Sequence, residues 1–200
     1  FEGVQVRYAL GATYTASTPA LVPSTVLAPP GGGGAILAEY FDNPELRGEP
    51  KLRRIEPRAY FEMGMEDPAV LAAVGRGEYS LRWTARLRPA ASGEYEMAVR
   101  TGMWNRTARA RLFLDDRELT LGAGRSSRLT SAQEAPGPRG PVRVRVALEG
   151  GREYAVRLEY RQPGSGGTLQ LGWIPPAAAA LSEAEALLRD SDVALVFVGL

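Results

Sequence analysis

Residues 79–88 read Tyr-Ser-Leu-Arg-Trp-Thr-Ala-Arg-Leu-Arg. Apolar or aromatic side chains occupy every odd position, and polar or charged side chains occupy every even position. Successive side chains of a β-strand point to opposite faces of its sheet, so this stretch predicts a strand with one buried face and one solvated face. The same alternation places Trp83 in the predicted core.

The same period of two recurs through the middle of the chain. Further alternating segments occupy residues 94–100, 109–114, 142–146, 154–161 and 169–173. Short turn-forming segments separate several of them, and this arrangement is typical of antiparallel sheets with one face in water. The sequence therefore predicts a mainly β fold, an antiparallel β-sandwich or barrel.

Some single features refine this prediction. Trp173 falls on the apolar face of the last strand and is expected in the core, whereas Asp115-Asp116 are interpreted as turn residues at a hairpin tip. Asp67-Pro68 is expected to open a short helical turn over residues 69–74. Tyr40 and Phe41 are neighbours on one strand, so their side chains point to opposite faces and one of the two is expected to be buried.

The two ends of the chain differ in character from this middle part. Residues 3–11 predict a short strand, and prolines followed by four glycines at 31–34 predict a linker. Near the other end, Ser182 and Glu185 form a capping-box pattern before a helix. The apolar run 193–198 then predicts a strand buried on both faces, as in parallel sheets. Both ends look cut from something longer.

The predicted organisation is therefore an insertion. Residues 1–34 are assigned to the end of one part of an α/β sandwich domain plus a linker, and residues 35–175 to the β-sandwich. Residues 176–200 are assigned to the resumption of the α/β domain.

Composition excludes several classes of function. The 200 residues contain neither Cys nor His, which removes thiol chemistry, Ser-His-Asp triads and the usual zinc sites. The formal net charge of +1 gives no electrostatic reason to expect nucleic acid or an anionic membrane as a partner. No apolar stretch approaches the roughly 20 residues that span a bilayer. No metal and no cofactor is implied, and the sequence assigns no compartment.

Four sequence blocks in the middle part carry a family resemblance. They are residues 37–43 with Leu46 and Gly48 following, and then residues 79–84, 89–95 and 110–116. In this order they resemble the protective-antigen-type (PA14) domain, a β-barrel-like sandwich found in glycosidases, adhesins and toxins.

Residues 3–11 and 184–200 resemble the α/β domain of family 3 glycoside hydrolases, on either side of its insertion point. The resemblance implies a fragment of a retaining β-glucosidase-like enzyme, which needs two carboxyl groups roughly 5 Å apart. In that family both groups lie outside the segment matched here, so we assign no catalytic residue and expect this chain alone to be catalytically silent. The implied partners are β-linked glucosides or short oligosaccharides and the rest of the parent glycosidase.

The segment after the predicted strand 94–100 is the candidate contact site. Some members of the PA14 family bind sugar through calcium held by two consecutive aspartates there, and this sequence has no aspartate at those positions. The segment offers an aromatic ring that can stack on a sugar and polar groups that can bind hydroxyls. The candidate carbohydrate contacts are Met103, Trp104, Asn105 and Arg106. An alternative is that Trp104 plugs one end of the sandwich.

Three functional hypotheses remain open at this point. In the first, the inserted β domain shapes the active-site entrance of a β-glucosidase-like hydrolase and limits substrate chain length. In the second, the chain is a stand-alone carbohydrate-binding or adhesive module without enzymatic activity. In the third, the β domain is a structural spacer without sugar contact.

Overall fold

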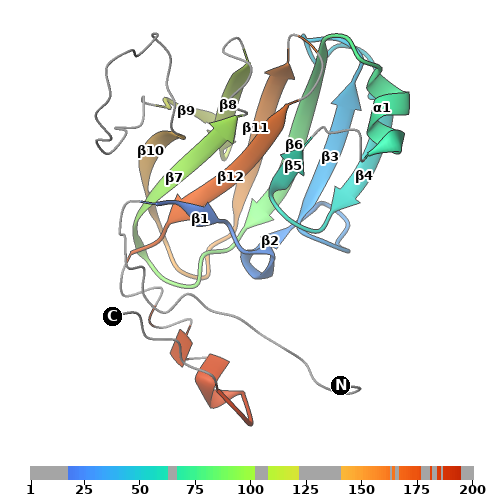
Figure 1. The fold of residues 1–200 in the computed structure, drawn as a ribbon. Helices are drawn as coiled ribbons and strands as arrows, with labels where there is room; N and C mark the ends of the chain where they lie inside the picture. The colour runs from blue at the N-terminus through green and yellow to red at the C-terminus, as the bar shows by residue number, and fades with distance from the viewer. Residues whose placement is uncertain are drawn as a thin grey trace, which may run out of the picture.

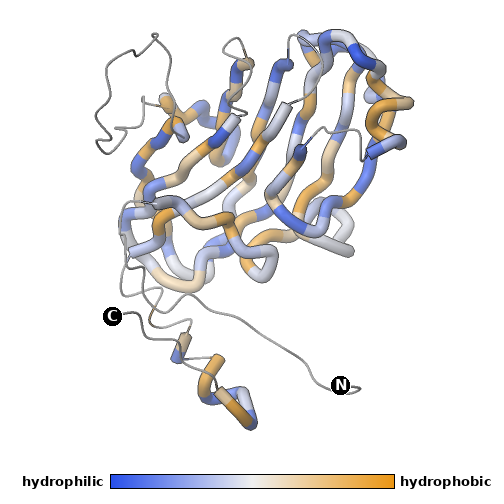
Figure 2. Tube along the Cα trace, viewed as in Figure 1, coloured by the Kyte–Doolittle hydropathy of each residue, from blue (hydrophilic) through white to orange (hydrophobic). Residues whose placement is uncertain are grey.

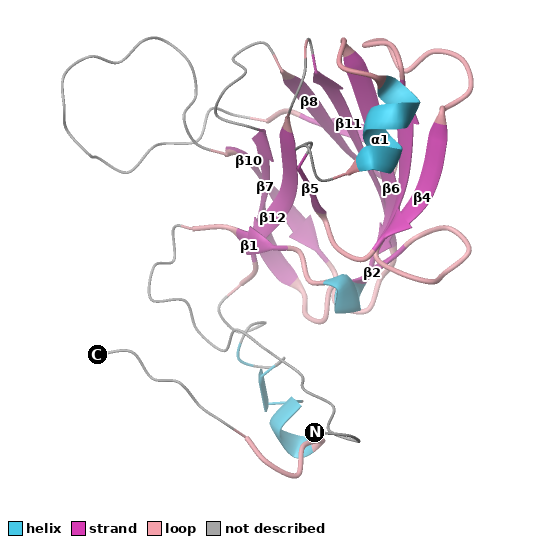
Figure 3. Ribbon diagram, turned by 45° about the vertical axis from the view of Figure 1, so that its right-hand side comes forward, coloured by secondary structure: helices cyan, strands magenta, loops and turns pink. Residues whose placement is uncertain are grey.

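The computed structural model of the protein describes residues 18–62, 67–101, 108–121, 141–162, 164, 167–176, 181, 184–185 and 187–194. Within these residues, two antiparallel sheets lie face to face (Figures 1 and 3), which confirms the predicted mainly β, antiparallel sandwich. The elements are β1 (Ala20–Leu21), η1 (Ser24–Val26), β2 (Leu27–Ala28), β3 (Ile36–Phe41), β4 (Leu52–Glu56), β5 (Tyr60–Glu62), α1 (Pro68–Val74), β6 (Tyr79–Leu87), β7 (Gly93–Thr101), β8 (Arg109–Leu114), β9 (Arg117–Leu119), β10 (Val142–Leu148), β11 (Tyr154–Gln162) and β12 (Thr168–Ile174).

The sheets are built around their longest strands. In the first, called sheet A, the strand order is β1-β12-β7-β10, and β5 also pairs with β12. In the second, called sheet B, the order is β4-β3-β6-β11-β8-β9, and β2 also pairs with β6. The strand predicted over residues 79–88 is β6, which lies inside sheet B between β3 and β11. It is therefore hydrogen-bonded along both edges.

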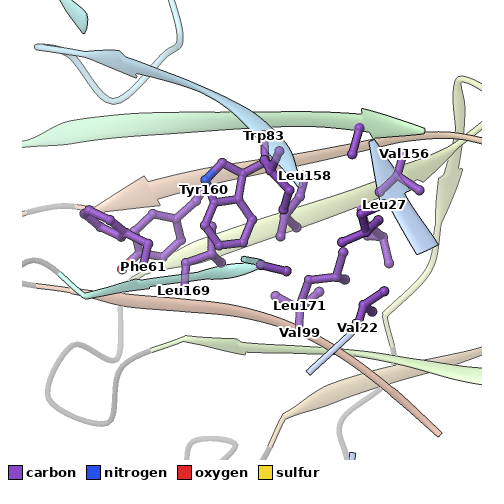
Figure 4. Packing of buried hydrophobic residues seen from close by; sticks show 14 of the residues in the cluster. Val22, Leu27, Phe61, Trp83, Val99, Val156, Leu158, Tyr160, Leu169 and Leu171 are labelled. Atoms are coloured by element: carbon purple, nitrogen blue, oxygen red, sulfur yellow. The ribbon is translucent and has the colours of Figure 1, made fainter. Parts of the chain in front are cut away.

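The core fills the space between the two sheets. The apolar positions of the alternating strands point inward, as Figure 4 shows for Trp83, Leu158 and Leu171. Hydrophobic and hydrophilic residues alternate along the same strands in Figure 2. Trp83 is 2% exposed and Trp173 is 5% exposed, so both predictions of a core tryptophan are confirmed.

The prediction that one of Tyr40 and Phe41 is buried is too low, because both side chains are buried. Tyr40 faces the core and donates a hydrogen bond to Oε1 of Glu56 at 2.5 Å. Phe41 lies on the outer face, where the guanidinium of Arg82 sits 5.4 Å from the centre of its ring. Ser80, opposite Phe41, donates to the backbone oxygen of Asn43 at 2.6 Å, so the chain after β3 folds back over this face.

The predicted helical turn is α1. Asp67 caps its N-terminus by accepting a hydrogen bond from the backbone N–H of Val70 at 3.1 Å, which satisfies one of the free donors of the first turn. The carboxylate also pairs with Arg54 of β4 at 2.6 Å. The Arg54 hydrogen bond is the main reason why the pKa of Asp67 is lowered, with the Val70 N–H acting in the same direction against the effect of burial.

Part of the predicted linker belongs to the sheets. β1 pairs with β12, and β2 pairs with β6. Val22, which follows β1, and Leu27, the first residue of β2, are buried in the core. The division of the chain at residues 34 and 175 stays a prediction. The strand predicted within residues 3–11 and the end of the apolar run 193–198 lie outside the described residues.

The described residues after β12 include helical backbone at 184–185 and at 187–189, where a helix is predicted, and also at Leu181, before the predicted cap Ser182. Leu181, Leu188 and Val193 are exposed, and Val193 has no strand conformation. Of the helices that the structure describes, none has the length and apolar character needed to cross a membrane.

Candidate functional site

We distinguish two ends of the sandwich. The end where the chain enters at Ala20 and leaves after Trp173 is called the attachment end, and the opposite end, at Thr101 and Leu169, is called the loop end. At the attachment end, Ala20 of β1 lies opposite Trp173 near the end of β12, so the chain enters and leaves the sandwich on neighbouring strands. Thr101, the last residue of β7, lies opposite Leu169 near the start of β12. Leu169 and Ile174 are five positions apart along β12, which corresponds to about 17 Å at the usual rise of a strand. Figure 1 shows these two ends of β12 and β7.

The predicted contact residues Met103, Trp104, Asn105 and Arg106 lie outside the described residues. The structure does describe the strands on either side, β7 up to Thr101 and β8 from Arg109. The segment that joins them therefore starts and finishes at the loop end.

A cluster of buried tyrosines closes the core at the loop end. The hydroxyl of Tyr160 donates to Oε1 of Gln162, which is 1% exposed, and the ring of Tyr79 lies edge-on to Tyr160 at 6.3 Å. Burial raises the pKa of both phenols, so they stay neutral at physiological pH. Gly167 has φ +137°, and a Cβ there would lie 2.6 Å from the Tyr79 hydroxyl and 2.8 Å from that of Tyr160. The cluster has no room for a larger residue at this position.

The outer face of sheet B carries an ordered row of charges. In register across five strands stand Arg53, Glu39, Arg82, Glu159 and Arg111, with alternating sign. Glu39 accepts from Nε of Arg53 at 3.1 Å and from Nε of Arg82 at 2.7 Å. Burial alone would raise the pKa of Glu39, but the hydrogen bonds from Arg82 and Arg53 outweigh it and lower the pKa.

One cross-strand pair on this face breaks the alternation of charge. Arg161 of β11 stands directly opposite Arg109 of β8, and both side chains are exposed. Sequence reasoning missed this pair because both arginines belong to ordinary alternating strands. Only the register, which the sequence alone does not give, brings them together.

The outer face of sheet A carries a second polar row that the sequence analysis missed. Gln170 of β12 lies between Tyr60 of β5 and Arg100 of β7, directly opposite both. Beside them, a shallow hollow is lined by Pro19, Ala98, Arg100, Pro141, Gln170 and Gly172. A Cβ on Gly172 would lie 2.8 Å from the backbone oxygen of Ala20, so glycine allows β1 to lie close to β12.

The paired aspartates have the geometry of a turn. Asp115 and Asp116 both have positive φ, 48° and 60°, and link β8 to β9 with Leu114 opposite Arg117. Such two-residue links follow the twist of the strands. Oδ1 of Asp115 accepts from the backbone N–H of Ala155 at 2.8 Å. In the described part of the chain, no group of three or more His, Cys, Asp or Glu side chains is arranged to hold a metal ion.

Replacing Asp116 with glycine is expected to raise the free energy of unfolding by about 0.5 kcal/mol, because glycine adopts positive φ without steric cost. Urea denaturation measures the change, and Asp116→Ala is the control that should destabilise. A response of the wild-type chain to calcium that Asp116→Gly abolishes would contradict a purely structural role for the turn.

The family model of the PA14 domain matches residues 33–183. Among curated proteins, the anti-sigma-I factor RsgI3 of Acetivibrio thermocellus is 26% identical over 143 residues, which make up 72% of this chain and 19% of that protein.

Solved structures show the same fold in two settings. An anti-sigma factor domain-containing protein from Clostridium clariflavum matches with a TM-score of 0.52 and 26% identity, over 72% of this chain and 42% of that one. A β-glucosidase from Kluyveromyces marxianus matches with a TM-score of 0.56 and 18% identity, over 95% of this chain and 20% of that one. This chain therefore spans less than half the length of each of these three relatives.

Proposed function

The chain belongs to the PA14 domain family, and from this premise we propose that it is part of a retaining β-glucosidase-like glycoside hydrolase of family 3. In this proposal the β-sandwich is an insert that shapes the entrance of the active site and limits the length of the oligosaccharides that enter. The catalytic nucleophile and the acid/base belong to other parts of the parent enzyme.

The observation that carries the proposal is the neighbouring position of the two ends of the sandwich. Ala20 and Trp173 are directly opposite residues of an antiparallel pair, so their Cα atoms lie about 5 Å apart. When a domain is inserted into a host domain, the two points where it joins the host chain must lie close together in space. The neighbouring ends of this sandwich meet this requirement. A domain that merely follows another in a row has no such need.

The separation of the two ends of the sandwich supports a role at an entrance. If the host holds the attachment end, the end of β7 at Thr101, after which the candidate contact residues follow in the sequence, lies about 17 Å away along a hydrogen-bonded sheet. Since Tyr79, Tyr160 and Gln162 already close the core at the loop end, Trp104 is not needed as a plug. This favours the proposal that Met103, Trp104, Asn105 and Arg106 contact the sugar.

The extent of the structural likeness also supports the enzyme. The similarity to the anti-sigma factor domain covers 72% of the chain, close to the family match, whereas the similarity to the β-glucosidase covers 95%. The wider match extends beyond the sandwich to the flanking segments that resemble the α/β domain of family 3 enzymes.

The similarity to anti-sigma factor proteins shows that this fold also occurs outside glycosidases. The second candidate is therefore a stand-alone carbohydrate-binding or adhesive module without enzymatic activity. The sequence on either side of this chain separates the two candidates. A barrel domain upstream and further α/β sequence downstream support the enzyme, whereas repeats or a surface anchor support the module. Titration of the 200-residue chain with glucosides, with and without calcium, tests the binding activity itself.

The decisive experiment removes the insert from the parent enzyme. Excision of residues 20–173 joins two points that are already neighbours. We expect kcat/KM for cellotetraose relative to cellobiose to rise about tenfold, which corresponds to about 1.4 kcal/mol of lost steric exclusion. An unchanged ratio in a folded, active enzyme would refute the entrance role.

A milder variant covers the case in which the excised enzyme does not fold. Trp104→Ala in the parent enzyme is expected to change the same ratio while the melting temperature stays that of the wild type. A lower melting temperature with an unchanged ratio would instead identify Trp104 as a plug of the sandwich.

A further inference from the structure

Arg109 and Arg161 differ from the other arginines on the outer face of sheet B. On this face Arg53, Arg82, Arg86, Arg111 and Arg157 each have an acidic partner. Within the part of the chain that the structure describes, neither Arg109 nor Arg161 has an ion-pair or hydrogen-bond partner. The nearest carboxylate in register on β11, Glu159, is already bound by Arg157 and Arg111.

The position of these two arginines is unfavourable unless something else binds them. Directly opposite residues of an antiparallel pair have Cβ atoms about 5 Å apart, and like charges at this distance destabilise the sheet. The other two charged residues on this face of β11 have favourable partners on β8. Glu159 stands opposite Arg111, which has the opposite charge, and Arg157 stands opposite Phe113 and lies over its aromatic ring. The pair thus concentrates two exposed positive charges and their guanidinium donors at one point of the loop end.

The neighbour of Arg161 on its other side is uncharged. Ser80 of β6 stands directly opposite Arg161, and its hydroxyl is already bound to the backbone of Asn43 and Leu46. Arg109 begins β8, directly after the segment that carries the candidate sugar contacts. Two guanidinium groups with free N–H donors can each donate hydrogen bonds to the oxygens of one carboxylate.

We propose that Arg109 and Arg161 bind the carboxylate of a uronic acid residue in a β-linked oligosaccharide. This inference rests on the proposed function, since the carbohydrate role comes from there, and it extends the substrate class from neutral glucosides to acidic saccharides. The carboxylate replaces the missing acidic partner of Arg109 and Arg161 on sheet B.

The test compares two disaccharides that differ by one carboxylate. Cellobiouronic acid and cellobiose are titrated into the 200-residue chain at low ionic strength, with calorimetry for affinity and backbone amide shifts for position. We expect the uronate to bind about tenfold more tightly, as one charge-assisted hydrogen bond can provide. The amides of residues 109–111 and 159–161 should shift, and added salt should remove the preference.

Three variants complete the test. Arg161→Gln and Arg109→Gln should each abolish the preference for the uronate, and each should raise the melting temperature at low salt because the repulsion is relieved. Arg86→Gln, on the same face but paired with Glu153, is the matched control and should keep the preference. Since the two test variants are expected to be more stable, loss of binding cannot be attributed to unfolding.

Several results would overturn the inference. Equal affinity for the two disaccharides would contradict a uronate site at Arg109 and Arg161, but it would still be compatible with the proposed binding of neutral sugars. Inorganic sulfate that competes as well as the uronate would reduce the pair to an unspecific anion site. A preference seen in the 200-residue chain but lost in the longer protein would mean that a carboxylate of the protein itself fills the pair.

Discussion

Replacing Trp83 with alanine is expected to lower the free energy of unfolding by about 4 kcal/mol, the upper range for aromatic-to-alanine changes in a packed core. Trp83 is 2% exposed in the middle of β6, with Leu158 of β11 on one side and Ala38 of β3 on the other. Ala38 is small, and replacement of the indole by a methyl group would place two small side chains opposite each other in the core. Urea denaturation followed by circular dichroism measures the loss.

The control for this prediction is Trp83→Phe, which separates packing from polarity. Among the described residues, no group accepts a hydrogen bond from Nε1 of Trp83. Phenylalanine removes this buried donor together with part of the volume, and the two effects oppose each other, so we expect a loss of only about 1 kcal/mol. Equal losses for the two variants would show that the indole N–H, and not the filled volume, is what matters.

Replacing Glu39 with glutamine is expected to have the second largest effect, a loss of about 2 kcal/mol at neutral pH. Glu39 is 8% exposed and is the shared partner of Arg53 and Arg82. Removal of its charge leaves Arg53 and Arg82, on the two strands that flank β3, without their shared carboxylate, although their partial exposure to water reduces the cost below that of a fully buried pair. Glu153→Gln, which breaks the exposed pair with Arg86, is the matched control and should cost about 0.3 kcal/mol.

The effect of Glu39→Gln should depend on pH in a defined direction. The pKa of Glu39 is lowered in the folded state, so the unfolded state binds its proton at higher pH than the folded state does. The stabilisation is therefore present in full above the ordinary carboxyl pKa of about 4.3 and is lost as the pH falls through the folded pKa. Stability curves of the two proteins should converge in acid, and a difference that stays constant down to pH 3 would contradict the assignment.

The alternation of side chains predicts the long strands because these strands have one face in the core and one in water. β4 shows no such alternation, since its inward positions hold Arg54 and Glu56. These two charges are tolerated because Asp67 at the start of α1 and the Tyr40 hydroxyl bind them. The strands β1, β2, β5 and β9 have two or three residues each, too few for a period to be recognised.

The site could be predicted only where it depends on local sequence. Asp115-Asp116 could be interpreted as a turn because two consecutive residues tolerant of positive φ are a local signal. The arginine pair and the row of Tyr60, Gln170 and Arg100 depend on cross-strand register. Register is set by packing between segments far apart in the sequence, so no single stretch of sequence reveals which side chains meet.

The pairing of β1 with β12 also determines how the sandwich responds to tension. Because the two strands are antiparallel and leave the sandwich at the same end, a force that pulls the flanking chains apart acts across the strands, at right angles to their length. Hydrogen bonds loaded in this way open one after another, as in a zipper, and not all at once as in shear. A host domain that spreads its two halves would peel β1 from β12 first, at low force, while the rest of the sandwich stayed folded.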